Sequence, residues 1–319
     1  MAGGTERILR RRIKSVESTK KITRAMQLIA ATRVVQAQVR AAEARPYSEQ
    51  ITNVILDLVG LGAEASHPLL ADRSDVKRTA FVVVTSDRGL CGAYNSSVIR
   101  AAEREVQAAR ADGHGYSLLL VGKKAQSFFR FQGYDIDETF LDMTDRPFYD
   151  DARQIARSVQ DRFAAGELNS VQLIYTRYLS AGSQRVVVRR FLPLEVEAGG
   201  EVEALQPTFE FEPSPEGILD ELLPRYVESR LYSALLDASA SEHASRQRAM
   251  KAATDNAEEL KTKLARQMNR ARQDAITTEI MEIVSGAEAL QADSATDEDL
   301  LPHHLVPPHL MPEHLDRTA

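Results

Sequence analysis

RYVESRLYSALLDASASEHASRQRAMKAATDNAEELKTKLARQMNRARQDAITTEIMEIVS, residues 225–285, contains neither proline nor glycine. A second such stretch, TERILRRRIKSVESTKKITRAMQLIAATRVVQAQVRAAEAR, covers residues 5–45. Because proline and glycine are the least favourable residues in a helix interior, the stretches predict helices about 90 Å and about 60 Å long. Helices of this length exceed the width of an ordinary domain. We therefore expect the two ends of the chain to pair as a long antiparallel coiled coil.

The contact faces of both helices can be predicted from residue spacing. In the first helix, apolar residues recur at mostly three- and four-residue steps: Leu9, Ile13, Val16, Ile22, Met26 and Ile29. Because a proline disfavours helical geometry in the residue before it, we expect Pro46 to end this helix at Arg45, with another helix over 47–61. The C-terminal face is rich in small residues: Leu231, Leu235, Ala238, Ser241 or Glu242, Ser245, Ala249, Ala253, Asn256, Leu260, Leu264, Met268, Ala271 and Ala275.

The end of the C-terminal run has a different character from the rest. Past Asp274 it becomes apolar, with Ile276, Ile280, Met281, Ile283 and Val284 and only Glu279 and Glu282 as acids. The shorter partner helix has run out at this level. An apolar helix tip needs to be enclosed, so the sequence predicts that another protein surrounds it.

The middle of the chain alternates strand-like and helical segments. Strands are expected at 81–84, 116–121, 171–178 and 185–192, and helices at 95–111, 123–131 and 150–165. This alternation predicts a largely parallel sheet covered on both faces, a Rossmann-like three-layer α/β body. The expected divisions are coiled-coil and following helix (1–60), α/β body (75–195), proline-containing connector (196–222), long C-terminal helix (223–290) and a disordered extension (291–319).

Composition narrows the class of protein. The single cysteine cannot form an internal disulfide, and no stretch approaches the roughly 18 apolar residues of a membrane span. The first 45 residues hold eleven Lys or Arg against three Glu. This cationic helix is either an electrostatic track for acidic partners or a solvated coiled-coil face.

Candidate catalytic and metal sites are weak. The turn after the first strand has glycines only at 89 and 92, which matches neither nucleotide-binding glycine pattern, and we interpret it as a tight strand-to-helix turn. Cys91 with His114 lacks an orienting third group. Carboxylates at Glu210, Glu212 and Glu216, and imidazoles at His303, His304, His309 and His314, could bind a metal, but their proline-rich surroundings do not favour a compact site. No enzyme site and no cofactor are predicted.

Five segments in collinear order resemble one family. They are KKITRAM (20–26), TSDRGLCG (85–92), RYVES (225–229), AMKAATDN (249–256) and ITTEIMEIVSGA (276–287). Together they resemble the γ subunit of F-type ATP synthases of the bacterial type, over about residues 1–290. The resemblance implies a central-stalk rotor without catalytic residues of its own, which couples proton-driven rotation of the c ring to conformational changes of the catalytic β subunits. The implied partners are the α and β subunits, the ε subunit and the c ring, at the cytoplasmic face of the bacterial plasma membrane, without membrane insertion.

The resemblance also implies residue roles. A contact with the acidic lever of β falls on Lys20, Lys21, Arg24 and Met26. A catch against β loops falls on Arg246, Arg272, Gln273, Thr277 and Glu279, and an apolar bearing on Ile276, Ile280, Ile283 and Val284. A foot on the c ring corresponds to Phe209, Phe211 and Glu212, beside Glu210.

Three questions stay open at this stage. The extension 291–319 departs from the family, and it could contact the δ subunit, brake rotation or have no role. A basic-helix nucleic-acid binder and an α/β enzyme with helical arms are the competing functions. Salt-sensitive DNA retention would test the first, and nucleotide binding by the isolated chain would test the second.

Overall fold

A computed structural model describes residues 2–60, 67–70, 78–194 and 214–298. The chain divides into two units, and each is described on its own. One unit, residues 20–255, contains the sheet and the parts of the two long helices next to it. The other combines residues 1–19 with residues 256–319. The predicted foot residues Phe209, Phe211 and Glu212 lie outside the described residues, as do the four C-terminal histidines.

The sheet of the larger unit has five strands in the order β3-β2-β1-β4-β5. The strands are β1 (Arg78–Val84), β2 (Gly115–Val121), β3 (Glu138–Phe140), β4 (Ser170–Tyr178) and β5 (Gln184–Leu192). β3, β2, β1 and β4 are parallel, whereas β5 pairs with β4 in the antiparallel direction. The prediction of a largely parallel sheet is confirmed, and the short strand β3 was not predicted.

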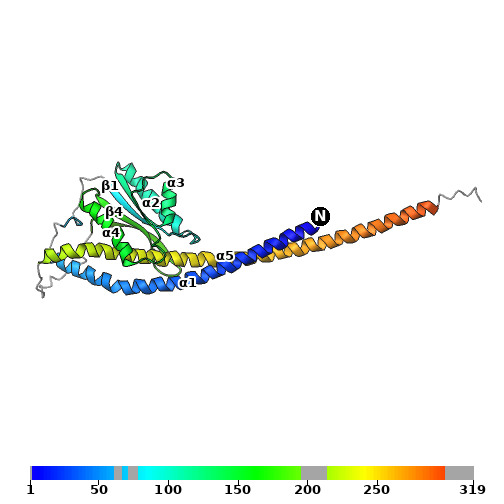
Figure 1. The fold of residues 1–319 in the computed structure, drawn as a ribbon, viewed down its shortest axis with the longest axis horizontal. Helices are drawn as coiled ribbons and strands as arrows, with labels where there is room; N and C mark the ends of the chain where they lie inside the picture. The colour runs from blue at the N-terminus through cyan, green and yellow to red at the C-terminus, as the bar shows by residue number, and fades with distance from the viewer. Residues whose placement is uncertain (1, 61–66, 71–77, 195–213, 299–319) are drawn as a thin grey trace, which may run out of the picture. The chain divides into compact units, whose positions relative to one another are not determined.

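Helices cover both faces of this sheet, as Figure 1 shows. α2 (Tyr94–Ala111) and α3 (Lys123–Phe131) cover one face, where Phe81, Val83 and Leu120 point into their core. α4 (Tyr149–Ala164) and parts of the two long helices cover the other face, where Val82 and Val84 are buried. Successive strand residues point to opposite faces, which is why one strand supplies both cores. The three-layer α/β fold is confirmed.

The first long helix, α1, runs without a break from Ala2 to Gly60 and contains Pro46. The expected end at Arg45 is therefore wrong. An internal proline removes one backbone hydrogen bond and crowds the preceding turn, at a cost of about 3 kcal/mol or more. Ile51, Ile55 and Leu58, beyond the proline, are each at most 5% exposed. Burying three such side chains contributes about 1.5–3 kcal/mol each, which outweighs the cost of continuing the helix.

The second long helix, α5, spans Pro215–Glu298 and contains Pro224. It begins inside the predicted connector and continues into the segment expected to be disordered, so both predicted boundaries are wrong. Leu219 and Leu223, which precede Pro224, are buried in the core that covers the sheet. The carbonyl oxygen of Pro224 accepts a hydrogen bond of 3.0 Å from Gln160 Nε2. Tertiary packing therefore starts the helix earlier than the proline pattern indicates.

The contact face between the long helices also differs from the prediction. In the larger unit it passes through Thr23, Ala30, Val34 and Ala37 of α1, whereas Ile22 and Ile29 are about 60% exposed. A hydrogen bond of 2.8 Å joins the buried hydroxyls of Thr23 and Thr254. Small side chains on this face allow the helix axes to approach closely, so the larger isoleucines next to them in sequence point outward.

In the smaller unit, α1 and α5 lie side by side in antiparallel directions (Figure 1). Lys261 Nζ lies 3.6 Å from Glu17 Oε1. Leu9, Ile13 and Val16 are half-buried as predicted, and Leu264, Met268, Ala271 and Ala275 are buried or half-buried on α5. Asn256 and Leu260, expected on this face, are exposed, and Ala257 and Lys261 lie on it in their place.

Candidate functional site

The turn after β1 is built by hydrogen bonds from three directions. Asp87 Oδ1 accepts the backbone N–H of Lys123 at 3.1 Å, at the start of α3. Its other oxygen accepts the hydroxyl of Thr144 at 2.9 Å. Ser86 N–H donates to Asn95 Oδ1 at 2.9 Å, which ties the turn to α2. The predicted strand-to-helix turn at the carboxyl edge of the sheet is confirmed, and it also joins the starts of two helices.

Gly122 allows this junction to close. It has φ +94°, and a Cβ atom there would lie 2.5 Å from the carbonyl oxygen of Thr85. Side chains rarely adopt this backbone conformation, and the distance is too short for a carbon next to an oxygen. Glycine is thus required for α3 to begin directly beside the β1 turn.

Arg246 connects α5 to the same turn. Its Nη2 donates to Glu242 Oε1 at 2.6 Å, and longer bonds of 3.3–3.4 Å reach the carbonyl oxygens of Arg88 and Gly89. The Arg246 and Glu242 side chains are 9% and 2% exposed. A short ion pair with so little exposure is held in one geometry. Arg246 therefore fixes the long helix to the turn, and we call this set of bonds the Arg246 lock.

The carboxyl group of Glu242 is in an unfavourable place for a charge. Its Oε2 is buried and has no hydrogen-bond partner within the described part of the chain. Burial raises the pKa of Glu242 from 4.5 to about 7, although Arg246 acts in the opposite direction. Burial also lowers the pKa of His243, which favours the neutral imidazole. Removal of Arg246 would leave this carboxylate without a counter-charge.

Asp145, Glu242 and His243 bring potential metal ligands within 4.8 Å of one another. The guanidinium of Arg246 already lies against two of them, with Nη1 3.3 Å from His243 Nδ1. The third potential ligand, Asp145, is paired with Arg33, whose Nη1 lies 3.1 Å from Asp145 Oδ2. The cations of the protein therefore take the positions that a metal ion would need.

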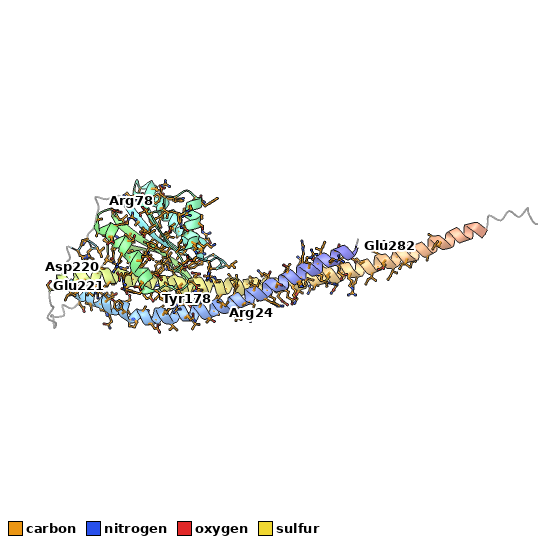
Figure 2. The ribbon with its side chains drawn as sticks, in the orientation of Figure 1. Arg24, Arg78, Tyr178, Asp220, Glu221 and Glu282 are labelled. Atoms are coloured by element: carbon orange, nitrogen blue, oxygen red, sulfur yellow. The ribbon has the colours of Figure 1, made fainter. Side chains whose placement is uncertain are left out.

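Of the four predicted lever-contact residues, Met26 shares a cavity with Arg246. Met26 lines a cavity of about 380 Å³ with Ile29, Arg33, Leu90 and Arg246. Lys20 and Met26 are half-buried, whereas Lys21 and Arg24 are exposed on α1. Arg24 points away from the α/β body in Figure 2. The structure thus brings Met26 and Arg246 to one cavity and leaves two of the predicted cations on the outer surface.

The other predicted catch residues behave differently from Arg246. Arg272, Gln273, Thr277 and Glu279 are all exposed on α5, in the smaller unit. Arg246 is buried in the larger unit and uses its guanidinium within the chain. Sequence reasoning placed these residues in one group, but the structure separates Arg246 from the rest.

The predicted bearing residues are exposed as a group. Ile276, Ile280, Ile283 and Val284 are between 46% and 67% exposed, and so is Met281. Counting along the antiparallel pair from Glu17 and Lys261, α1 reaches its first residues at about the level of Ile276. Figure 2 shows Glu282 on the stretch of α5 beyond that point. We call residues 276–284 the tip.

The alternative catalytic pair is not assembled. Cys91 follows the carboxyl end of β1, whereas His114 precedes the amino end of the parallel strand β2. Seven-residue strands separate these ends by about 20 Å. Burial raises the pKa of the Cys91 thiol, and Asn95 Nδ2 donates to its sulfur at 3.1 Å. This thiol is therefore a packing group rather than an activated nucleophile.

Sequence reasoning missed the cluster around Glu242. A Glu-His pair followed by Arg246 one turn later lies among small residues in a part of α5 where each neighbouring turn is buried. A charged residue in such a position usually has a buried partner, which is the signal that could have revealed it. Asp145 could not have been found in this way, because it reaches the cluster from a loop far away in sequence.

No helix within the described residues is long and apolar enough to cross a membrane. A family model described as ATP synthase matches residues 5–290. The chain is 48% identical over 297 residues to the ATP synthase gamma chain of Frankia casuarinae, an alignment that covers 90% of this chain and 98% of the relative. It is 46% identical over 301 residues to the ATP synthase gamma chain of Mycolicibacterium smegmatis, and that alignment covers 90% of this chain and 98% of the relative.

Two solved structures that resemble this chain come from mitochondrial ATP synthases. One chain from the central stalk and c ring of the Tetrahymena thermophila enzyme is 28% identical, with a TM-score of 0.55, and covers 73% of this chain and 99% of its own. A chain from the OSCP/F1/c-ring structure of the Euglena gracilis enzyme is 19% identical, with a TM-score of 0.64. The match covers 96% of this chain and 99% of the Euglena chain. The second likeness concerns the fold alone.

Proposed function

We propose, because this chain belongs to the γ-chain family of ATP synthases, that its paired helices turn inside the ring of catalytic subunits and set the state of each nucleotide site. Membership of this family makes the chain a rotor subunit of the central stalk that serves ATP synthesis. In the proposal, proton flow turns the c ring, the ring turns this chain, and each β subunit meets a different side of the shaft. ATP then forms from ADP and phosphate on the β subunits.

The exposed tip is the observation that carries this proposal. Several neighbouring apolar side chains on one helix form a surface that water solvates poorly, and α1 extends only to about the level of Ile276, the first of them. A sleeve contributed by the α and β subunits would cover them. Apolar contacts have no preferred direction, so such a sleeve would hold Ile276, Ile280, Ile283 and Val284 without resisting rotation.

The lever contact is proposed for Lys20, Lys21, Arg24 and Met26. The exposed ammonium of Lys21 and guanidinium of Arg24 suit a moving acidic surface, because interactions between exposed charges act over several ångströms and need no fixed geometry. Met26 lines one cavity with Arg246. Motion imposed at Met26 would thereby reach the body through Arg246 and the β1 turn.

The catch is proposed for Arg272, Gln273, Thr277 and Glu279, whose polar side chains are exposed immediately before or within the tip. Hydrogen bonds from them to β loops would resist rotation at particular angles. For Arg246 we propose an indirect role instead, in which it fixes α5 on the body. Its burial makes a direct bond to a β loop unsuitable.

The remaining assignments follow from the same proposal. Phe209, Phe211 and Glu212 would contact the c ring, with the ε subunit against the α/β body, and residues 291–319 would lie near the δ subunit. The chain would work at the cytoplasmic face of the bacterial plasma membrane without a catalytic site of its own. The buried Cys91 and the cations that occupy the Asp145 cluster support that last point.

Rotation can be tested directly in the assembled enzyme. Gln107→Cys on the exposed side of α2, in a Cys91→Ser background, provides one thiol for a bead while the catalytic subunits are fixed to glass. We expect the bead to rotate in one direction when ATP is added. A bead that stays still while the same complexes hydrolyse ATP would contradict the rotor role. The Cys91→Ser chain without the added thiol is the control for bead attachment.

A further inference from the structure

A cavity of about 440 Å³ lies where the end of β4 meets the two long helices, within the larger unit. Residues of α1 between positions 38 and 49 form one wall, and residues of α5 between positions 233 and 240 form the other. Tyr178, at the end of β4, also lines it, and Figure 2 shows this residue where the sheet meets the long helices. We call this space the β4 cavity. It shares no lining residue with the cavity that Met26 lines.

Small side chains leave the β4 cavity open. Ala41 and Ala42 of α1, and Ser233 and Ala240 of α5, line it where larger residues would fill the space between the helices. The lining positions of each helix follow steps of three and four residues, so they share one side of that helix. The volume lies within the range of about 300–1,000 Å³ that is typical of small-molecule sites.

The carboxyl group of Asp237 belongs to this cavity. Asp237 lies in the middle of the α5 residues that line it, on the side of the helix that they share. The side chain is half-buried and makes no hydrogen bond or ion pair with any residue that the structure describes. Burial raises the pKa of Asp237 from 3.8 to about 6. The ionised carboxylate therefore lacks a close counter-charge, which is unusual for a partly buried charge.

Arg177 brings the opposite charge to the same space. Side chains alternate along a strand, so Arg177 shares the face of β4 with the buried Leu173 and Tyr175, which pack in the core next to the long helices. Its charge lowers the pKa of Asp237 and therefore acts on that carboxylate. The two groups are not close enough to form an ion pair, and the Arg177 guanidinium has no other partner among residues 2–60, 67–70, 78–194 and 214–298.

The other ionisable groups around Asp237 do not replace this missing partner. Arg45 also lowers the pKa of Asp237, but its Nε lies 3.1 Å from Glu49 Oε1, so its charge is already compensated. Tyr175 is neutral, because burial raises the pKa of its hydroxyl. The β4 cavity thus presents one carboxylate and one guanidinium that remain separate.

We propose that the β4 cavity binds a small zwitterion of the amino-acid type. The ammonium group of the ligand pairs with the Asp237 carboxylate, and its carboxylate pairs with the Arg177 guanidinium. A simple cation is repelled by the arginines and a simple anion by Asp237, so a ligand with both charges fits best. The hydroxyls of Ser48 and Ser233 line the same space and can add hydrogen bonds. This site goes beyond the rotor role and does not depend on it.

Ligand-observed nuclear magnetic resonance titrations of the full-length chain, at constant ionic strength, test the site. The probes are glycine, β-alanine and γ-aminobutyrate, which carry the same two charges at increasing separation. We expect saturable binding of at least one probe, which Asp237→Asn and Arg177→Gln each weaken by about tenfold or more, because each removes a charge-assisted interaction. Asp255→Asn and Arg266→Gln, exposed on α5, are the matched controls and should leave affinity unchanged.

The protonation of Asp237 gives a second measurement. Binding of the ammonium group needs the ionised carboxylate, and the pKa of Asp237 is about 6. Affinity should therefore fall by about tenfold between pH 7 and pH 5 in the wild-type chain, and Asp237→Asn should lose this dependence. Thermal unfolding followed by circular dichroism checks the fold. Asp237→Asn should keep the stability of the wild type, because it removes a charge without a close partner.

Ethylammonium and acetate, which each carry one of the two charges, distinguish a zwitterion site from a simple ion site. Both should bind about tenfold more weakly than the best zwitterion. Ethylammonium or acetate binding as tightly as the zwitterions would overturn the proposal. Absence of saturation by all three zwitterions, or equal affinity in wild type, Asp237→Asn and Arg177→Gln, would overturn it too. Because no catalytic subunit is present, each of these results leaves the rotor test unaffected.

Discussion

Replacement of Arg246 by alanine should destabilise the α/β body in a way that depends on pH. The substitution removes the 2.6 Å ion pair and leaves the Glu242 side chain, 2% exposed, without its counter-charge. Breaking one partner of a buried ion pair costs about 3–5 kcal/mol. We expect a loss of this size in the free energy of unfolding at pH 8.

The pH dependence follows from the carboxyl group that remains. Burial raises the pKa of Glu242 above its ordinary value, so protonation stabilises the folded state. That contribution is present at low pH and disappears as the pH rises through about 7. Without Arg246 the pKa rises further, since the arginine lowers it. The cost of the substitution should therefore be about 1–2 kcal/mol smaller at pH 6 than at pH 8, because one pKa unit corresponds to about 1.4 kcal/mol.

Urea unfolding followed by far-ultraviolet circular dichroism at both pH values measures these losses, and the absence of tryptophan makes this signal the practical choice. The matched variant is Arg246→Ala with Glu242→Gln, in which no buried charge remains. It should be more stable than Arg246→Ala alone at pH 8. Equal losses at pH 6 and pH 8, together with a double variant no more stable than the single one, would refute the reasoning.

Two further predictions concern the β1 junction and the lever contact. Gly122→Ala should destabilise the body by about 3 kcal/mol, because it strains the backbone and brings the added carbon into a clash with Thr85. Gly113 has φ +74° and nothing within 4 Å of the added carbon, so Gly113→Ala should cost only the backbone strain, about 1 kcal/mol. Thermal unfolding compares them, and similar losses would contradict the role of the Thr85 contact. Met26→Lys places a charge in the cavity beside Arg33 and Arg246, and it should lower ATP-driven proton pumping in membrane vesicles more than ATP hydrolysis. An equal fall in both activities would argue against a coupling role.

Much of the fold could be predicted because its signals are local. Long stretches without proline or glycine, and short apolar runs alternating with helical ones, depend only on neighbouring residues. The described strands other than β3, and the shorter helices, were accordingly predicted within a few residues of their bounds. The ends of α1 and α5 were not, because Pro46 and Pro224 oppose the helix locally while burial of Ile51, Leu219 and their neighbours favours it.

The contact face of the helices shows the same division. Hydrophobic spacing placed Ile22 and Ile29 on it, but close packing selects Thr23 and Ala30. Spacing indicates which residues share a side of a helix, and it does not tell which side meets the partner when large and small residues are both available.

The sequence by itself determined the presence of two long helices, the α/β class of the body, the apolar tip and the family, since each depends on residue types and their order. Only the tertiary structure decided that Arg246 is a buried lock and that Met26 lies next to it. It also showed that Asp237 and Arg177 line one cavity between the long helices and β4. These residues are far apart along the chain, and their chemistry arises from distance, burial and charge. Those quantities exist only once the strands, the turn and α5 have been brought together.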